Sequence, residues 1–280
     1  MEKRLVLFAI FILAHAGESL AQSPPSFKTV KTNQEKRNVM SIDQPQLFQY
    51  GVANAFIDGL YEGELSVEQL KRKGNFGIGA PNHIDGELTI VDGTAYQSNA
   101  KGQTIEAPEA LMTPFAFVTN FRKDTNQTLS DIHDLKDLFA RIETLLPNPN
   151  AIYALRIKGT FSSIRTRAFP PVREKPFKPL AQLLDQQQFF ELKGTAGDMI
   201  GFYIPGYLSG INIVGLHFHF LSQDRKSGGH VVGVHAKYLT IEIAEIKALH
   251  LLPQHTEDFK NYKFNGVNSP NLQKIEKGAN

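Results

Sequence analysis

The sequence predicts an α+β fold: a two-domain, β-rich architecture with mixed or antiparallel sheets and a few peripheral helices. Short segments rich in the β-branched and aromatic residues of strands outnumber segments with helical spacing of apolar residues. The chain is 41% hydrophobic, 10% aromatic and 21% charged, which is a globular composition. At about 150 residues per domain, 280 residues are enough for two domains with a substantial core.

The first 42 residues are predicted to lie outside these domains. Lys3 and Arg4 precede an apolar run at 5–14, and small residues follow at 19–21, which is the order of a secretory signal peptide over 1–21. The run is shorter than the roughly 20 apolar residues that cross a bilayer. Residues 22–42 are polar and contain two prolines, as in a flexible arm. We therefore expect an exported protein, periplasmic or extracellular, with no membrane association after signal cleavage.

The N-terminal β-rich domain is predicted over 43–169 and should begin with two helices. Asp43 can cap a helix whose apolar residues recur at helical spacing as far as Gly59. Ser66 and Gln69 have the spacing of a capping box, and Gly74 can end the helix that they begin. This second helix is expected over 66–73.

Strands and one further helix complete the predicted first domain. Asp92-Gly93 favours a tight hairpin turn between strands at 87–91 and 94–97. A strand is expected at 115–118, and the apolar spacing of 131–146 predicts an amphipathic helix. A second hairpin is expected from strands at 151–157 and 161–167 around Lys158-Gly159.

The C-terminal domain, predicted over 170–280, begins with a proline-rich segment. Four prolines within 170–179 exclude a regular element and suggest a crossover between the two halves of the molecule. Beyond it, β-rich segments at 199–204, 212–221, 230–236 and 238–246 predict strands of a metal-binding domain, followed by a C-terminal tail.

Charge and cysteine content exclude several classes of function. Thirty Lys and Arg against 28 Asp and Glu give a net charge of +2, too balanced for the basic surface of a nucleic-acid-binding protein. Without cysteine there can be no disulfide, thiolate zinc finger, iron–sulfur cluster or cysteine nucleophile. Any metal must therefore be held by histidine and carboxylate side chains.

Three histidines form the most informative motif. Side chains alternate faces along a strand, so His217 and His219 point to the same side while Leu216, Phe218 and Phe220 point into a core. A polar turn over 223–229 then leads to a strand that opens with His230, which an antiparallel hairpin brings opposite His219. Three protein ligands with one open position are typical of a catalytic zinc site.

The local motif does not by itself identify the reaction. A cupin site would require a carboxylate at position 223, where this chain has Gln223. Metallo-β-lactamase-like hydrolases would require Asp and His at the positions of Leu221 and Ser222. An α-carbonic anhydrase also uses H-x-H on one strand, but its third histidine lies farther along the chain than His230 does here.

Ten segments, in order, resemble the α-acetolactate decarboxylase family from about residue 45 to the C-terminus. They are DGLYEGE from Asp58, GNFGIG from Gly74, DGEL from Asp85, TPF from Thr113, YALRI from Tyr153, RTR from Arg165, EKP from Glu174, GFYIP from Gly201, HFH from His217 and SGGH from Ser227. The resemblance implies a two-domain β-rich fold, a homodimer and a Zn²⁺ ion on His217, His219 and His230.

The resemblance also implies three catalytic side chains: Glu87, Arg167 and a glutamate near the C-terminus that folds back over the metal, here Glu276. One departure is Ala80, seven residues before Glu87, where the family often has Thr. The Pro81-Asn-His83 turn also differs from the family pattern.

The implied activity is zinc-dependent decarboxylation of 2-acetolactate to acetoin and CO₂ through a metal-stabilised enediolate. The expected partners are this small-molecule substrate and a second copy of the chain, with no nucleic acid. Two alternatives remain at this point: an exported zinc lyase or hydrolase of the carbonic-anhydrase type, and a metal-binding protein without turnover.

Overall fold

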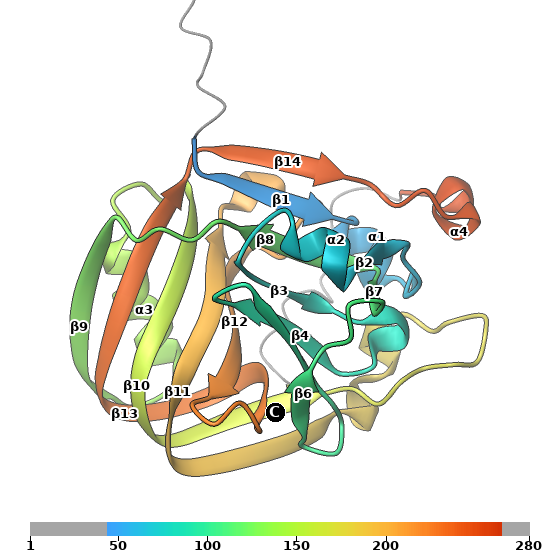
Figure 1. The fold of residues 1–280 in the computed structure, drawn as a ribbon. Helices are drawn as coiled ribbons and strands as arrows, with labels where there is room; N and C mark the ends of the chain where they lie inside the picture. The colour runs from blue at the N-terminus through green and yellow to red at the C-terminus, as the bar shows by residue number, and fades with distance from the viewer. Residues whose placement is uncertain (1–43, 265–280) are drawn as a thin grey trace, which may run out of the picture. The chain divides into compact units, whose positions relative to one another are not determined.

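The structure, a computed structural model, describes residues 44–264 and confirms a β-rich α+β fold with mixed and antiparallel sheets (Figure 1). The predicted signal peptide (1–21), the arm (22–42), Asp43 and Glu276 lie outside the described residues. The domain boundary at residue 170 and the homodimer stay predictions. Within 44–264, no helix is long and apolar enough to cross a membrane.

The first sheet has seven strands in the order β14-β1-β8-β3-β4-β5-β6. The strands are β1 (Gln46–Tyr50), β3 (Phe76–Ala80), β4 (Glu87–Val91), β5 (Thr94–Ser98), β6 (Thr104–Glu106), β8 (Phe115–Thr119) and β14 (Ala248–Leu252). All neighbours pair antiparallel except β1 and β14, which are parallel. A separate short pair is formed by β2 (Leu65–Ser66) and β7 (Met112–Thr113).

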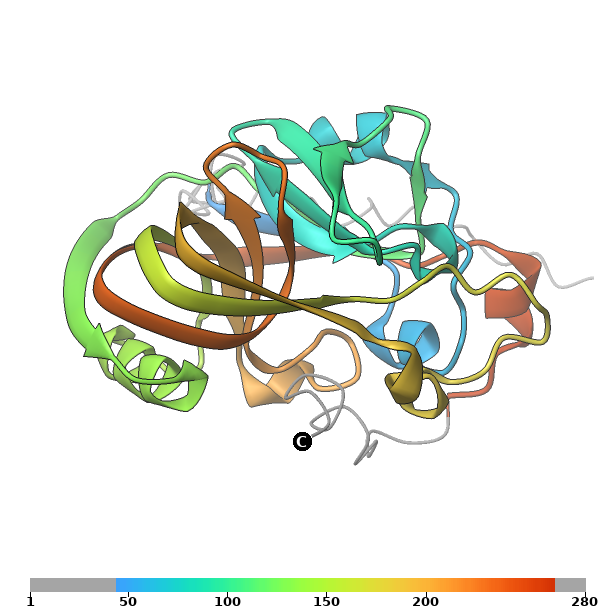
Figure 2. The same cartoon turned by 90° about the horizontal axis from the view of Figure 1, so that it is seen from below.

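The second sheet has five strands in the order β10-β11-β12-β13-β9, and three of them are long. They are β9 (Thr125–Ile132), β10 (Ile152–Ala168), β11 (Gln188–Ile204), β12 (Gly215–Ser222) and β13 (Gly228–Ile246). Because β10 also pairs with β13, the four strands β10 to β13 close into a barrel-like ring. Figure 2 shows these long strands curving beneath the first sheet.

Helices are few and short. They are α1 (Ala53–Ile57), α2 (Val67–Lys71), α3 (Leu135–Leu145) and α4 (Glu257–Asn261), with 3₁₀ turns at Asn82–Ile84, Leu180–Gln182, Leu184–Gln186 and Gly206–Leu208. The capping box predicted for α2 is confirmed, since Ser66 and Gln69 exchange side-chain and backbone hydrogen bonds. The hairpin at Asp92-Gly93 is also confirmed, with φ of 53° and 80° at the two turn residues.

Several predicted elements were wrong in their type or limits, including the strand expected at 199–204, which is only the C-terminal part of β11. The helix expected over 43–59 is strand β1 followed by the short helix α1, because β1 is held between β8 and β14. The helix expected over 131–146 begins only at Leu135, since the preceding residues extend β9. The hairpin at 151–167 is the single strand β10, and the two strands expected at 230–246 are the single strand β13.

The proline-rich segment 170–179 contains no helix or strand, as predicted, but it is not a crossover between halves. It lies between β10 and β11, which are antiparallel neighbours in one sheet. It is fixed in place by hydrogen bonds from the Val172 amide to the His83 carbonyl (2.9 Å) and from the Tyr61 hydroxyl to the Lys178 carbonyl (2.9 Å).

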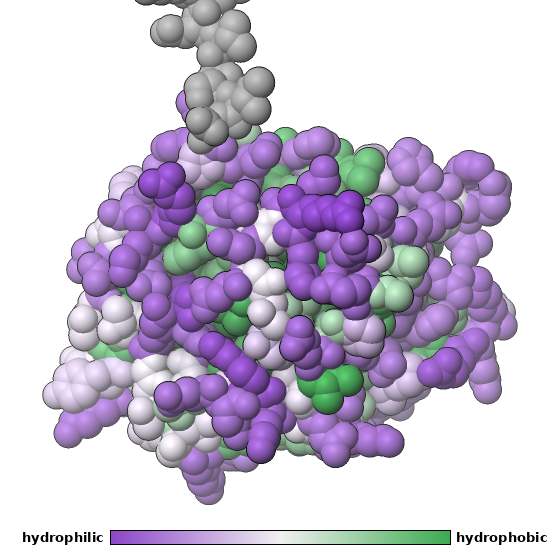
Figure 3. Space-filling view, viewed as in Figure 1, coloured by the Kyte–Doolittle hydropathy of each residue, from purple (hydrophilic) through white to green (hydrophobic). Residues whose placement is uncertain are grey.

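The apolar core has one part between the sheets, one within the coiled second sheet and one under α2. Phe76, Phe117, Ile200 and Phe202 belong to the first part and bring strands of both sheets together. Burial of this surface is the main stabilising contribution, at about 25 cal/mol per Å² of apolar area. The face of the molecule shown in Figure 3 is predominantly hydrophilic, with scattered apolar residues.

An ionic network also joins the two sheets. On β11, the Asp198 carboxylate accepts hydrogen bonds from Arg156 of β10 and from Arg225 of the β12–β13 turn, both at 3.0 Å. Arg156 in turn binds both carboxylate oxygens of Asp92, in the β4–β5 turn, at 2.8 and 3.1 Å. The side chain of Asp198 is 11% exposed, whereas that of Asp92 is 66% exposed. The buried half of the network should therefore contribute most of its stability.

We predict that Asp198→Asn will lower the free energy of unfolding by about 3 kcal/mol, because it removes the buried partner charge of Arg156 and Arg225 and leaves Arg156 paired only with the exposed Asp92. Asp92→Asn, which changes the exposed partner of the same Arg156, should cost less than about 1 kcal/mol. Urea denaturation of both variants measures the difference, and equal losses would contradict it.

Candidate metal centre

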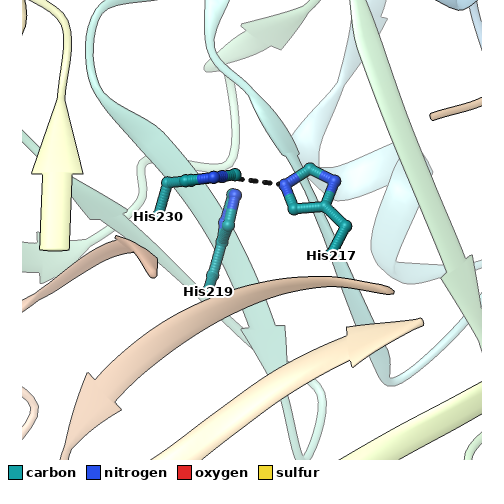
Figure 4. A group of neighbouring side chains, drawn as sticks. All are labelled: His217, His219 and His230. Carbon is teal, nitrogen blue, oxygen red and sulfur yellow. Dashed lines mark hydrogen bonds between the residues drawn. The ribbon is translucent and has the colours of Figure 1, made fainter. Parts of the chain in front are cut away.

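The β12–β13 hairpin brings the three predicted histidines together. His217 and His219 alternate with buried Leu216, Phe218 and Phe220 on β12, and His219 pairs directly with His230 of β13. Figure 4 shows the three rings directed toward a common point. The cross-strand register predicted from the sequence is therefore confirmed.

The nitrogens of this histidine cluster are close enough to share one ion. His217 Nε2 and His230 Nδ1 lie 2.9 Å apart, and one potential ligand nitrogen from each ring lies within 4.8 Å of the other two. The three rings are mutually tilted by 54–69°, so the lone pairs approach from different directions. Among the described residues, this is the one group of at least three potential His, Asp or Glu ligands found this close together.

Burial favours the uncharged, metal-binding form of His217 and His219. All three imidazoles of the cluster are nearly inaccessible to solvent. Desolvation, followed by the positive charge of Arg167, lowers the pKa of His217 to about 3. Desolvation and the neighbouring His217 hold the pKa of His219 well below its ordinary value. At neutral pH, His217 and His219 thus offer neutral nitrogen donors without competition from protons.

Backbone contacts from β4 orient the ring of His219, a feature that the sequence did not reveal. His219 Nδ1 lies 3.0 Å from the Leu88 carbonyl oxygen and 3.4 Å from Thr89 Oγ1. Donation from Nδ1 to the carbonyl fixes the tautomer in which Nε2 carries the lone pair. The first sheet thereby determines which nitrogen of a second-sheet histidine can bind a metal.

Glu87 and Arg167, predicted from the resemblance, lie beside the histidine cluster. The guanidinium of Arg167 donates to Glu87 Oε1 at 2.9 Å, and Glu87 Oε2 lies 3.3 Å from His219 Nε2. Glu87 is the first residue of β4, and Arg167 pairs with His230 across β10 and β13. Both side chains are at least nine-tenths buried. Their proximity places a charged carboxylate and guanidinium at the edge of the cluster, while their chemical roles remain predictions.

One pocket is lined by these polar side chains and by apolar ones. The apolar part includes Phe56, Ile57, Ile84, Phe115, Phe169 and Ile213. Ala80 also lines it. The lining thus combines charged and polar side chains with apolar ones, which suits a small molecule that carries both charged and alkyl groups.

Comparison with known proteins identifies the family. The sequence profile described as Alpha-acetolactate decarboxylase matches residues 47–266. The chain belongs to the α-acetolactate decarboxylase family.

Relatives and solved structures agree with this assignment. The chain is 32% identical to the α-acetolactate decarboxylase of Brevibacillus brevis over 99% of both chains. It is also 32% identical to that of Bacillus subtilis strain 168, over 78% of this chain and 86% of the relative. The crystal structure of the B. subtilis enzyme superposes with a TM-score of 0.78 at 30% identity, covering 84% of this chain and all of that one. The resemblance and the expectation of an enzyme, a decarboxylase, are confirmed.

Replacing any ligand of the histidine cluster should abolish metal binding. We predict that His217→Ala, His219→Ala and His230→Ala retain no zinc after gel filtration, because two imidazoles alone bind a divalent ion far more weakly than three. His235→Ala is the matched control, since His235 is an exposed histidine on the same strand β13. Atomic absorption measures the zinc content of each variant. One equivalent of zinc in a variant of the histidine cluster would refute the assignment of that histidine as a metal ligand.

In the metal-free protein, stability should decrease as the pH falls below about 6.5. The unfolded chain binds a proton at the position of His217 near pH 6.5, but the folded chain does so only at about pH 3. Between these values the unfolded state binds more protons, so acid favours unfolding, by at most about 1.4 kcal/mol per pH unit for this residue.

Chelator-treated protein should therefore unfold at a lower urea concentration at pH 5 than at pH 7. His217→Gln, which cannot titrate at this position, should show a smaller difference. An unchanged pH dependence in that variant would contradict the prediction.

Proposed function

We propose that this protein decarboxylates 2-acetolactate to acetoin and CO₂ with a zinc ion bound by His217, His219 and His230. The observation that carries the proposal is that one pocket of a member of this family contains three buried imidazoles together with the buried Arg167–Glu87 pair. The substrate has a carboxylate, a hydroxyl, a keto oxygen and two methyl groups. The pocket lining offers charged and polar side chains for the former groups and apolar side chains for the methyl groups.

The residues present fit a zinc ion. Zinc accepts three nitrogen ligands and leaves a position for water or substrate. The low pKa of His217 and the fixed tautomer of His219 provide lone pairs without prior proton loss. When bound, such an ion supplies a Lewis acid that withdraws electron density from the substrate oxygens.

Arg167 would bind and orient the substrate carboxylate. Its guanidinium is planar and permanently charged, and it can form two parallel hydrogen bonds with a carboxylate. The ion pair with Glu87 and the ring of Phe169, 5.2 Å from the guanidinium carbon, hold it in one position. A carboxylate held in this way has a fixed orientation relative to the bond that must break.

Glu87 would transfer the proton that completes the product. Loss of CO₂ leaves an electron pair at carbon 2, which must take up a proton to give acetoin. Glu87 Oε2 lies on the side of the carboxyl group that faces His219, so Glu87 can take up one proton from water, donate it to carbon 2 and return to the carboxylate form. Glu276 is a second candidate for this role and lies outside the described residues.

The proposal extends to the location and assembly of the protein. The N-terminal pattern of charge, apolar run and small residues supports export with cleavage after residue 21. The resemblance supports a homodimer. Mass spectrometry of secreted protein and light scattering of the purified mature chain test these two parts.

Acetoin formation from racemic 2-acetolactate by the mature protein tests the central proposal. We expect activity that disappears after chelation and returns with zinc. A folded, zinc-loaded sample that forms no acetoin would refute the decarboxylase proposal. Hydration of CO₂ by that sample would favour the carbonic-anhydrase alternative, and absence of both activities would favour a metal-binding protein without turnover.

Replacement of Arg167 should impair turnover without removing the metal. We predict that Arg167→Ala lowers kcat/KM by at least about 100-fold, since a charge-assisted pair contributes about 3 kcal/mol in a buried site. Its zinc content should equal that of the unmodified protein, because Arg167 is not a ligand in the proposal. Loss of zinc would instead make Arg167 a structural residue.

A further inference from the structure

The turn between β3 and β4 has an uncommon backbone conformation directly before Glu87. His83 and Ile84 have φ values of 62° and 49°, and Gly86 has 83°. The left-handed region is unfavourable for side chains with a Cβ atom, and for a β-branched residue such as Ile84 it is a genuine outlier. Glycine or asparagine would adopt it at lower cost. The conformation of Ile84 must therefore be imposed by the surrounding structure.

Hydrogen bonds from four other parts of the chain impose this conformation. The His83 amide donates to the Tyr61 carbonyl, and the Gly86 amide donates to the Phe169 carbonyl. From the other side, the Val172 amide donates to the His83 carbonyl and the Gln97 side chain to the Asp85 carbonyl. Strained residues that are held so completely tend to occur at functional sites.

The left-handed backbone conformation directs the side chain of Ile84 to a defined place. Its side chain is only 2% exposed, belongs to the core part between the sheets and lines the pocket that contains Glu87 and the histidine cluster. Ile84 is thus an apolar wall whose position is fixed by the same turn that positions Glu87. The substrate groups suited to such a wall are alkyl groups, because the charged and oxygen-bearing groups would be bound by the polar side chains of the lining, Glu87, Arg167 and the histidines.

We infer that Ile84 is a specificity-determining residue that limits the size of the alkyl groups on the substrate. The inference rests on the proposed function for the identity of the substrate, but the size limit itself is a property of the pocket. A hydrophobic pocket distinguishes ligands that differ by one methylene by about 10- to 200-fold. Shortening Ile84 to Ala should reduce this discrimination.

The test compares kcat/KM for 2-acetolactate and for its two ethyl homologues, in which an ethyl group replaces either methyl group. We expect Ile84→Ala to raise the ratio of homologue to 2-acetolactate by about 10-fold or more for at least one homologue. Ile204→Ala is the matched control: Ile204 is 1% exposed and belongs to the same core part, but it does not line the pocket. An unchanged ratio for both homologues in Ile84→Ala would refute the inference, as would an equal change in Ile204→Ala.

A binding measurement separates this inference from the proposed function. 2-Hydroxy-2-methylpropanoate and 2-ethyl-2-hydroxybutanoate lack the keto group and cannot follow the proposed reaction. Calorimetry with the zinc-loaded protein should give a larger relative affinity for the ethyl compound in Ile84→Ala than in the unmodified protein. Absence of acetoin formation with this shift present would refute only the proposed function, whereas absence of the shift would refute the role of Ile84.

The strained backbone has its own test. At most positions, a protein with Gly is less stable than the same protein with Ala, because Gly loses more conformational entropy on folding. At position 84 we expect Ile84→Gly to have a thermal midpoint equal to or above that of Ile84→Ala, whereas Ile204→Gly should lie below Ile204→Ala. A thermal midpoint of Ile84→Gly below that of Ile84→Ala would contradict the left-handed conformation on which the inference depends.

Discussion

The antiparallel pairing of β12 with β13 is the constraint on which the site depends. These two strands are hydrogen-bonded over only a short stretch, Leu221 to His219 against Gly228 to His230. A shift by one residue would turn the paired histidines to opposite faces of the sheet, since side chains alternate along a strand. Gly228 allows this register, because a Cβ there would lie 2.5 Å from Ser98 Oγ and 2.6 Å from the Phe220 carbonyl oxygen. The geometry of the histidine cluster therefore follows from backbone packing as much as from the histidines themselves.

The rest of the site is assembled across the two sheets. The second sheet supplies the histidines and Arg167, while β4 of the first sheet supplies Glu87 and the carbonyl that orients His219. The ionic network around Asp198 and the shared apolar core hold the two sheets against each other. Neither sheet alone carries both the three histidines and Glu87, so the packing of the two sheets brings these groups together.

Features determined by local chemistry could be predicted from the sequence. The capping box at Ser66, the Asp92-Gly93 turn and the histidine hairpin each depend on a few adjacent residues, and all three are present.

The wrong predictions concern features determined by distant neighbours. Gly159 suggested a turn, but it lies inside β10. Glycine is needed there because β13 packs closely: a Cβ atom at this position would meet Leu239 and the Tyr238 carbonyl. The left-handed conformation at Ile84 has no signal in the sequence, because it is imposed by hydrogen bonds from segments far along the chain.

The parallel pairing of β1 with β14 has a consequence for the order of folding. Gln46 lies beside Ala248, so the edge of the first sheet combines the first and last described strands. Contacts between residues so far apart in the chain form slowly, because a long loop must close before they stabilise anything. During synthesis, this edge cannot close until β14 (Ala248–Leu252) has been made. The histidine hairpin, β10 and β4 all precede β14, so every described group of the site is available before the edge strand that completes the first sheet.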